Sequence, residues 1–313
     1  MAVPSTALRQ GGVALVTALL VVALATVAAV RLASRQALDV RRSASVLDRA
    51  QALAYAEGIE AWAARLLRRD QLDNEVDHLG EDWAKALPPI TVPGGQLSGR
   101  LEDLQGRFNI NNLRTPDGGI DAHELERFRR LLTLLGLPVE IADAVADWLD
   151  ADLEARAPGG AEDTEYLTRT PPYRAANRPL ASLSELRLVK GVDAAAWRKL
   201  AQVLTALPEP TPINVNTASA TVLRLLDPTL TEAEAQGLVE ARGRKGFASL
   251  QDFLAQEQLA GRRLDTAGWS VSSHYFLLRA DVRMGSAHLP LRAVLHRDET
   301  GVHLVRQAQV AAP

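Results

Sequence analysis

The chain contains no cysteine, and only 4% of its 313 residues are aromatic. The absence of cysteine excludes disulfides, thiolate metal sites, iron–sulfur clusters and a cysteine nucleophile. A formal charge of -3 and a pI near 6.1 provide no overall positive field that would attract nucleic acid. With 47% hydrophobic and 23% charged residues the composition is that of a folded protein, and this length allows two domains.

The motifs of common enzyme classes are also missing. The sequence has no GxSxG nucleophile elbow, no Walker A loop and no Rossmann glycine fingerprint, and its six histidines form no HExxH pair. One enzyme hypothesis stays open, a hydrolase that uses paired carboxylates of the central acidic segment. No aromatic platform for a sugar accompanies those carboxylates, so we expect a protein that is not an enzyme.

A long apolar run near the N-terminus is the first informative feature that is present. Gly11 to Val30 are twenty residues without a charge. As a helix they span about 30 Å, which matches the hydrocarbon core of a bilayer. The alternative is a buried helix of a soluble protein. Arginines lie on both sides, at Arg9 and from Arg31 onward, so charge counting does not fix the orientation. We expect one membrane-spanning segment.

The helical pattern continues beyond this run. Residues 35–69 contain no proline and are rich in residues that favour a helix. Tyr55, Ile59, Trp62 and Leu66 are spaced by 4, 3 and 4 and form one apolar stripe. The sequence therefore predicts a single helix from Val13 to about Arg69, roughly 85 Å long, whose second half packs on a core.

Strand patterns flank a helical region. A cluster of proline and glycine at residues 88–95 ends the first helical segment, and Phe108 and Ile110 alternate with polar residues in the segment 96–112. Residues 121–264 carry helical periodicity. From Trp269 the period changes to two, with strands expected over 275–284, 289–295 and 302–307. These patterns predict an α+β fold, in which a long N-terminal helix packs on a small antiparallel sheet and a large all-α domain is inserted between the strands.

An acidic segment follows within the helical region. Asp143, Asp147 and Asp150 have helical spacing, and further carboxylates surround the turn at residues 158–160. Carboxylates gathered around a turn are the oxygen ligands that Ca²⁺ prefers, but the spacing is not that of an EF-hand. The spacing alone leaves two interpretations open, a calcium site or a solvated acidic surface.

A second motif, INVNTA at residues 213–218, is followed by two helical segments and resembles a helix-hairpin-helix repeat. Such repeats bind phosphates through backbone N–H groups at a glycine hairpin. Here the link between the helices runs from Asp227 through Pro228 and lacks these glycines, although Arg242, Arg244 and Lys245 form a small basic patch. We interpret the region as a helical packing module and expect no nucleic acid, with a membrane-anchored DNA-binding protein as the alternative.

The N-terminal layout resembles that of type IV pilins and pseudopilins, with a short polar leader, Gly11-Gly12 and then an apolar helix. The resemblance implies that a prepilin peptidase cleaves after Gly12, that Val13 becomes the methylated N-terminus, and that the leader is cytoplasmic while the rest is periplasmic. The usual glutamate at the fifth mature position is replaced by Thr17. An unpaired carboxylate in a bilayer is energetically unfavourable. In pilins the resemblance implies that this glutamate pairs with the free N-terminal amine of a neighbouring subunit. A subunit at the tip has no such neighbour beyond it, so the absence of the glutamate is consistent with a tip position.

The remaining motifs resemble those of the K-type minor pseudopilin of the type II secretion system. They are LEDLQGRFNINNL at 101–113, ADWLDAD at 146–152, GAEDTEY at 160–166, PPYRAANRPLASLSELRLVKG at 171–191 and INVNTA. The resemblance implies a subunit of the cell inner membrane that joins I- and J-type minor pseudopilins at the tip of the pseudopilus, initiates or limits its growth and meets secretin or cargo. It divides the chain into a leader (1–12), a transmembrane part (13–30), a pilin-like helix with the first strands (31–112), the inserted helical domain (113–265) and the remaining strands (266–313).

The same resemblance implies structural calcium in the inserted domain. The ligands that we expect are Asp150, Asp152, Glu162 and Asp163, with Asp147 and Asn177 as further candidates. Such an ion would hold a loop in place and would take no part in chemistry.

Overall fold

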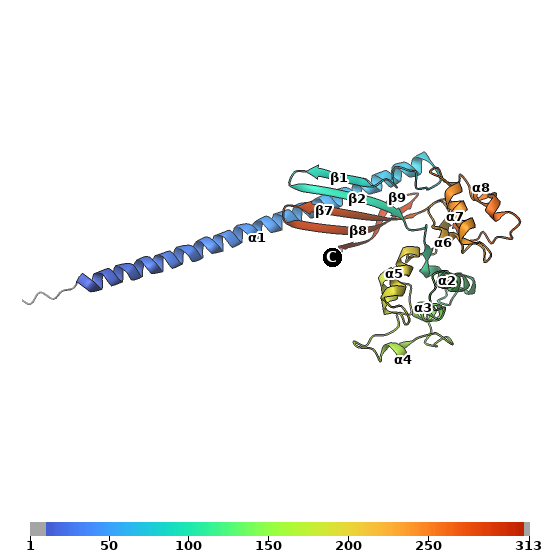
Figure 1. Cartoon of the computed structure of the whole chain (residues 1–313), viewed down its shortest axis with the longest axis horizontal. Helices are drawn as coiled ribbons and strands as arrows, with labels where there is room; N and C mark the ends of the chain where they lie inside the picture. The colour runs from blue at the N-terminus through green and yellow to red at the C-terminus, as the bar shows by residue number, and fades with distance from the viewer. Residues whose placement is uncertain (1–10, 310–313) are drawn as a thin grey trace, which may run out of the picture.

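A computed structural model describes residues 11–309, so the first ten residues of the expected leader lie outside the described part of the chain. Helix α1 runs from Gly11 to Asp73 without interruption, 63 residues or about 95 Å. Its first half projects alone from the rest of the molecule (Figure 1). The 18-residue window of highest hydropathy within Gly12–Asp73 has a mean hydropathy of 2.8 and is not buried, so by length and composition this helix can cross a membrane.

The second half of α1 packs on a sheet through small side chains. The buried positions are spaced by 4, 3, 4 and 4 and are Ala52, Ala56, Ile59, Ala63 and Leu67. Of the stripe expected from the sequence, only Ile59 lies at the centre of this contact, whereas Tyr55, Trp62 and Leu66 pack at its margin. The alanines allow the helix axis to approach the sheet, and the larger side chains fill the space beside it.

The sheet is antiparallel with the order β1-β2-β7-β8-β9. Its strands are β1 (Leu87–Val92), β2 (Gly95–Asp103), β7 (Tyr275–Met284), β8 (Ala287–Asp298) and β9 (Gly301–Gln309). One face packs on α1 through residues such as Phe276, Leu278, Leu291 and Leu295. Because alternate side chains point to opposite faces, the other face carries Arg100, Arg279 and Arg292.

The proline cluster belongs to a strand, which differs from the expected break. β1 contains Pro88 and Pro89, and its register with β2 shifts between Leu87 and Ile90. β1 lies at the edge of the sheet, where a missing backbone N–H leaves no partner unpaired. Helix α1 instead ends at Asp73, before any proline.

The inserted domain occupies the chain between β2 and β7, and Figure 1 shows it at the end of the sheet that lies farthest from the free half of α1. Its helices are α2 (Ala122–Leu134), α3 (Ile141–Leu149), α4 (Asp163–Tyr166), α5 (Ala194–Val203), α6 (Ala220–Leu223), α7 (Glu232–Ala241) and α8 (Leu250–Leu254), with short 3-10 helices η1 (Ile110–Leu113), η2 (Leu183–Leu188) and η3 (Glu257–Leu259). Polar side chains begin several of them: Asp121 caps α2, Asp193 caps α5, and Thr231 forms a capping box with Glu234 at α7.

Both boundaries of the insertion differ from the expected residues 112 and 265. Phe108–Asn109 (β3) does not extend the large sheet but pairs in parallel with β4 (Leu204–Thr205). Trp269–Ser270 (β6) likewise pairs with β5 (Ile213–Asn214). The chain leaves the sheet after Asp103 and returns at Tyr275, where Leu104 N donates to the carbonyl of Tyr275 at 3.0 Å. The alternating pattern around residue 108 reflects burial inside the helical domain, where Phe108 stacks on Phe128.

Candidate functional site

Two groups of carboxylates place their oxygens close together within residues 11–309. We call Asp150, Asp152 and Glu162 the loop cluster, and Asp70, Asp77 and Glu81 the junction cluster. In each cluster the three side chains offer oxygens within 4.8 Å of one another. Because a group of acids is often only a solvated or ion-paired surface, the hydrogen-bond partners of each oxygen decide what the cluster can hold.

The loop cluster lies between α3 and α4. Asp150 is the capping residue directly after α3, and Glu162 precedes the first residue of α4. Asp150 is 1% exposed and Glu162 is 3% exposed, whereas Asp152 is open to solvent. The loop therefore brings two buried carboxylates and one exposed carboxylate to a common point.

Several oxygens in this loop and beside it lack a hydrogen-bond donor in the described chain. They include both carboxylate oxygens of Glu162, Oδ1 of Asp150 and Oδ1 of Asn177. Burial and then the charges of the neighbouring aspartates, Asp147 first, raise the pKa of Glu162 to about 7. Burying a carboxylate without a donor is unfavourable unless a proton or a cation compensates it. The oxygens fit a hard cation such as Ca²⁺, which binds carboxylate and amide oxygens.

The other expected ligands have different partners. Asp147 accepts hydrogen bonds from the backbone N–H groups of Arg156 and Ala161, so it fixes the loop from inside. Asp163 lies next to Glu162 in sequence but accepts from Ala175 N at 3.0 Å, and its carboxylate lies outside the loop cluster. Consecutive residues at the start of α4 point in different directions, which their spacing in the sequence does not show.

Asn177 and Arg156 complete the loop. Asn177 adopts a left-handed conformation with φ 47°, and its Nδ2 donates to the carbonyl of Asp152 at 2.8 Å. Arg156 donates to Asp150 Oδ2 at 3.0 Å and neutralises part of the negative charge. Sequence reasoning did not single out Arg156, although it is the basic residue closest to these acids along the chain.

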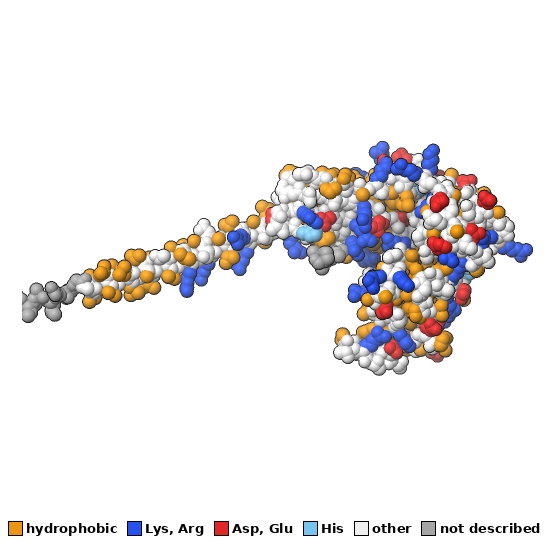
Figure 2. Space-filling model, viewed as in Figure 1, with side chains coloured by type: hydrophobic (Ala, Val, Ile, Leu, Met, Phe, Trp, Pro, Cys, Tyr) orange, Lys and Arg blue, Asp and Glu red, His pale blue; other side chains and the backbone are white. Residues whose placement is uncertain are grey.

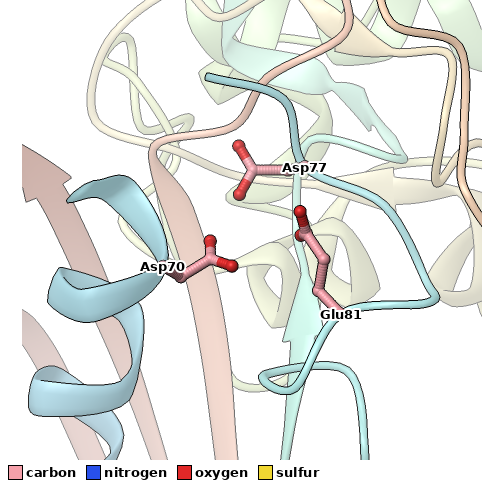
Figure 3. Close-up of side chains that lie close together, drawn as sticks. All are labelled: Asp70, Asp77 and Glu81. Atoms are coloured by element: carbon pink, nitrogen blue, oxygen red, sulfur yellow. The ribbon is translucent and has the colours of Figure 1, made fainter. Parts of the chain in front are cut away.

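The junction cluster has a different environment (Figure 3), with its three carboxylates directed toward one another from the end of α1 and the loop that follows. Arg297 of β8 donates to Asp70 at 2.8 Å and to both oxygens of Asp77 at 2.5 and 2.7 Å. Glu81 accepts from Trp83 Nε1 at 2.5 Å. Its second oxygen has no donor in the part of the chain that the structure describes, and it lies 3.6 Å from His78 Nε2. A guanidinium group therefore already supplies the positive charge here, and we assign the junction cluster as an ion-pair network.

This network ties the two parts of the molecule together. Asn214, from the INVNTA motif, donates to the carbonyl of Asp77, to Asp103 Oδ2 and to Ser273 Oγ. Ser273 N in turn donates to Asp77 Oδ2 at 2.7 Å. The motif that resembles part of a helix-hairpin-helix repeat is therefore a structural connection. Arg242, part of the expected basic patch, is 9% exposed and donates to the carbonyls of Val215 and Ala218.

The expected processing site lies at the first turn of α1. Gly12 and Val13 are helical, and Val13 is 70% exposed. The hydroxyl of Thr17 donates to the carbonyls of Val13 and Ala14, both at 3.0 Å. The polar atom at the position of the missing glutamate is thus paired inside its own helix.

Comparison with known proteins gives the family. The domain descriptions of "Type II secretion system (T2SS), protein K" match residues 106–209 and 213–272, which are almost the whole insertion between β2 and β7. Over 303 residues the chain is 42% identical to type II secretion system protein K of Pseudomonas aeruginosa, with 93% of this chain and 90% of that protein covered. The chain belongs to the protein K family of the type II secretion system.

Other members of the protein K family give the same result. Protein K of Klebsiella pneumoniae is 37% identical over 306 residues, covering 92% of this chain and 93% of that protein. Among solved structures, the GspK–GspI–GspJ complex of the enterotoxigenic Escherichia coli type 2 secretion system contains a chain with a TM-score of 0.77 and 30% identity. That match covers 87% of this chain and all of the other. The expected fold is confirmed, and the protein is a minor pseudopilin, a structural component of a secretion apparatus.

Proposed function

We propose that this minor pseudopilin occupies the tip of the periplasmic pseudopilus together with I- and J-type minor pseudopilins. The observation that carries the proposal is the likeness along most of the chain to the K subunit of a K–I–J complex. The wide inserted domain at the end of the sheet also favours a terminal position, since a broad subunit does not fit inside a thin helical filament. Thr17 needs no partner subunit because its hydroxyl is paired within α1.

Co-purification tests this assembly. The full chain in detergent is mixed at micromolar concentration with the I- and J-type subunits of the same secretion system. We expect a complex that survives size-exclusion chromatography, and a membrane-anchored helix of unrelated sequence serves as the control. Separate elution of the full chain from both partners would contradict the tip assignment.

The proposed life cycle begins at the inner membrane. α1 anchors the chain with its leader in the cytoplasm and the sheet and inserted domain in the periplasm, and prepilin peptidase cleaves after Gly12. The distal inserted domain then limits filament growth or initiates it, and meets secretin or cargo. Mass spectrometry of chain made in membranes that contain the peptidase should find Val13, methylated or free, as the first residue. A chain that still begins at Met1 would contradict this processing.

For the loop cluster we propose a structural calcium ion held by Asp150, Asp152 and Glu162, with Asn177 Oδ1 as a further oxygen. The proposal is supported by the unpaired oxygens of Glu162 in a buried position. The ion would supply the positive charge that the loop lacks and would join the end of α3 to the start of α4. Asp163 is left out of this set because its carboxylate accepts from Ala175 N.

A further inference from the structure

The outer face of the sheet carries three arginines side by side. Arg100 of β2 lies opposite Arg279 of β7, which lies opposite Arg292 of β8. Neighbouring strands are about 4.8 Å apart, so the three side chains begin within about 10 Å of one another. Like charges directly opposite each other destabilise a sheet. The row takes no part in the apolar contact with α1, which is made by the opposite face.

Two further arginines extend this positive surface. Arg306 of β9 lies opposite Val294, two residues beyond Arg292 on the same face, and Arg107 follows the end of β2. Figure 2 shows Lys and Arg side chains gathered over the end of the sheet beside the inserted domain. We call Arg100, Arg279, Arg292 and Arg306 the arginine face.

Glu102 lies among these arginines, whereas Asp281, which borders Arg100 and Arg279, pairs with Arg283, and Glu185 lies near Arg306. Glu102 forms ion pairs with Arg100 at 2.9 Å, Arg107 at 3.1 Å and Arg279 at 2.7 Å. Burial alone would raise the pKa of Glu102, but Arg279 and then the other two arginines hold it below its ordinary value. Within residues 11–309 neither Arg292 nor Arg306 forms an ion pair. The surface therefore has an excess of positive charge. The ion pairs of Glu102 show that its arginines can bind a carboxylate.

The position of the arginine face decides between a membrane and a protein as its partner. Gly99, next to Arg100, faces α1 at the level of Ile59. Ile59 is 29 residues beyond Val30, the end of the apolar run, which places this level about 40 Å along the helix from the membrane segment. Electrostatic attraction to a charged surface is screened within about 10 Å at 0.1 M salt. Lipid headgroups therefore do not reach these arginines, whereas a neighbouring protein does.

We propose that the arginine face binds an acidic protein segment whose carboxylates repeat every 5–7 Å. Carboxylates at positions i and i+4 of a helix, or at alternate positions of an extended chain, have about this spacing and match the distance between neighbouring strands. Arg279 contacts both oxygens of Glu102 and shows the geometry that an incoming carboxylate would find. The inference does not depend on the tip position proposed above, and either can fail alone.

A binding measurement on the full chain in non-ionic detergent tests the proposal. The probe is labelled hexaglutamate, titrated at 25 and 150 mM NaCl, with hexalysine as the peptide control. We expect binding of hexaglutamate that weakens at the higher salt concentration. The double variant Arg292→Gln with Arg306→Gln should bind about tenfold more weakly, since it removes two exposed charges that can pair with the peptide.

A matched variant and a stability measurement complete the test. Arg244→Gln with Arg263→Gln removes the same charge from two exposed arginines of the inserted domain and should leave the affinity within about twofold. Arg292→Gln alone should raise Tm by about 1–3 °C, because it removes a repulsion between neighbouring strands. An equal loss of binding in both double variants, binding of phosphatidylglycerol vesicles through the same arginines, or a fall in Tm on Arg292→Gln would overturn the proposal.

Discussion

The junction cluster and the loop cluster contain the same kinds of residue but solve the problem of buried negative charge in different ways. At the junction, Arg297 comes from a strand more than 200 residues away in sequence and donates to Asp70 and Asp77. In the loop, Glu162 is buried, and no described residue donates to either of its oxygens. The proximity of three carboxylates therefore does not by itself identify a metal site. The partners of the oxygens separate a cluster whose charge an arginine balances from one in which several buried oxygens have no donor among residues 11–309.

Removal of Arg297 should have the largest effect. In Arg297→Met the buried carboxylate of Asp77 and the partly buried carboxylate of Asp70 lose their main donor, and we expect a loss of about 3–5 kcal/mol in the free energy of unfolding. Urea denaturation of the full chain in detergent measures this loss. Arg156→Met in the loop is the matched control and should cost less, since Arg156 is half exposed. Equal losses would mean that the two clusters do not differ as described.

Glu162→Gln should abolish the response to calcium. If the proposed ion binds, a calcium concentration about a hundredfold above Kd should stabilise the wild-type chain by about 2.7 kcal/mol, which would appear as a higher Tm in calcium than in EGTA. The variant should show no such difference, and in EGTA it should be at least as stable as wild type because an unpaired buried charge is gone. A calcium response that persists in Glu162→Gln would remove this residue from the site.

The junction should make stability depend on pH. Burial and then the charge of Glu81 raise the pKa of Asp70 to about 7, and burial raises the pKa of Asp103 to about 6. A raised pKa means that the folded chain holds protons that the unfolded chain has released, so this contribution to stability is present at low pH and is lost as pH rises toward 7. This effect should lower Tm as the pH is raised from 5 to 8. In Asp70→Asn the decrease in the free energy of unfolding over this pH range should be smaller than in wild type, by an amount on the order of 1 kcal/mol.

The smallest effect on calcium binding is expected at Asp163. Asp163→Asn weakens the hydrogen bond to Ala175 N, so we expect a stability loss of about 0.5–1.5 kcal/mol. The difference in Tm between calcium and EGTA should stay within about 1 °C of the wild-type difference, because the carboxylate lies outside the loop cluster. A Tm difference as small as that of Glu162→Gln would restore Asp163 as a ligand.

Much of the fold follows from local patterns. The charge-free run and the absence of proline predicted α1, and the alternation in residues 275–295 predicted β7 and β8, because these signals depend on each segment alone. β1 was missed because prolines usually interrupt strands, and only its edge position makes them acceptable. The two-residue strand β3 was misassigned because its partner β4 lies about a hundred residues later.

The candidate site was predictable to a smaller extent. Asp150, Asp152 and Glu162, which lie together in the structure, could be named from the sequence because acidic residues around a turn are visible there. Arg297 was not found, since nothing local connects it with Asp70 or Asp77. Asp163 was included among the expected ligands because it follows Glu162 in the sequence. In the structure its carboxylate instead accepts a hydrogen bond from Ala175 N. Local composition shows where acids gather, whereas long-range folding decides which of them are already neutralised.

The two points at which the chain leaves and re-enters the sheet have a consequence for the origin of this protein. Asp103 and Phe276 are direct neighbours on adjacent antiparallel strands, and one hydrogen bond joins Leu104 to Tyr275. A two-residue turn would close the same gap as an ordinary hairpin. The helical domain is thus a cassette with its ends side by side, and an ancestral filament subunit could acquire or lose it in one genetic event without altering the register of a single strand.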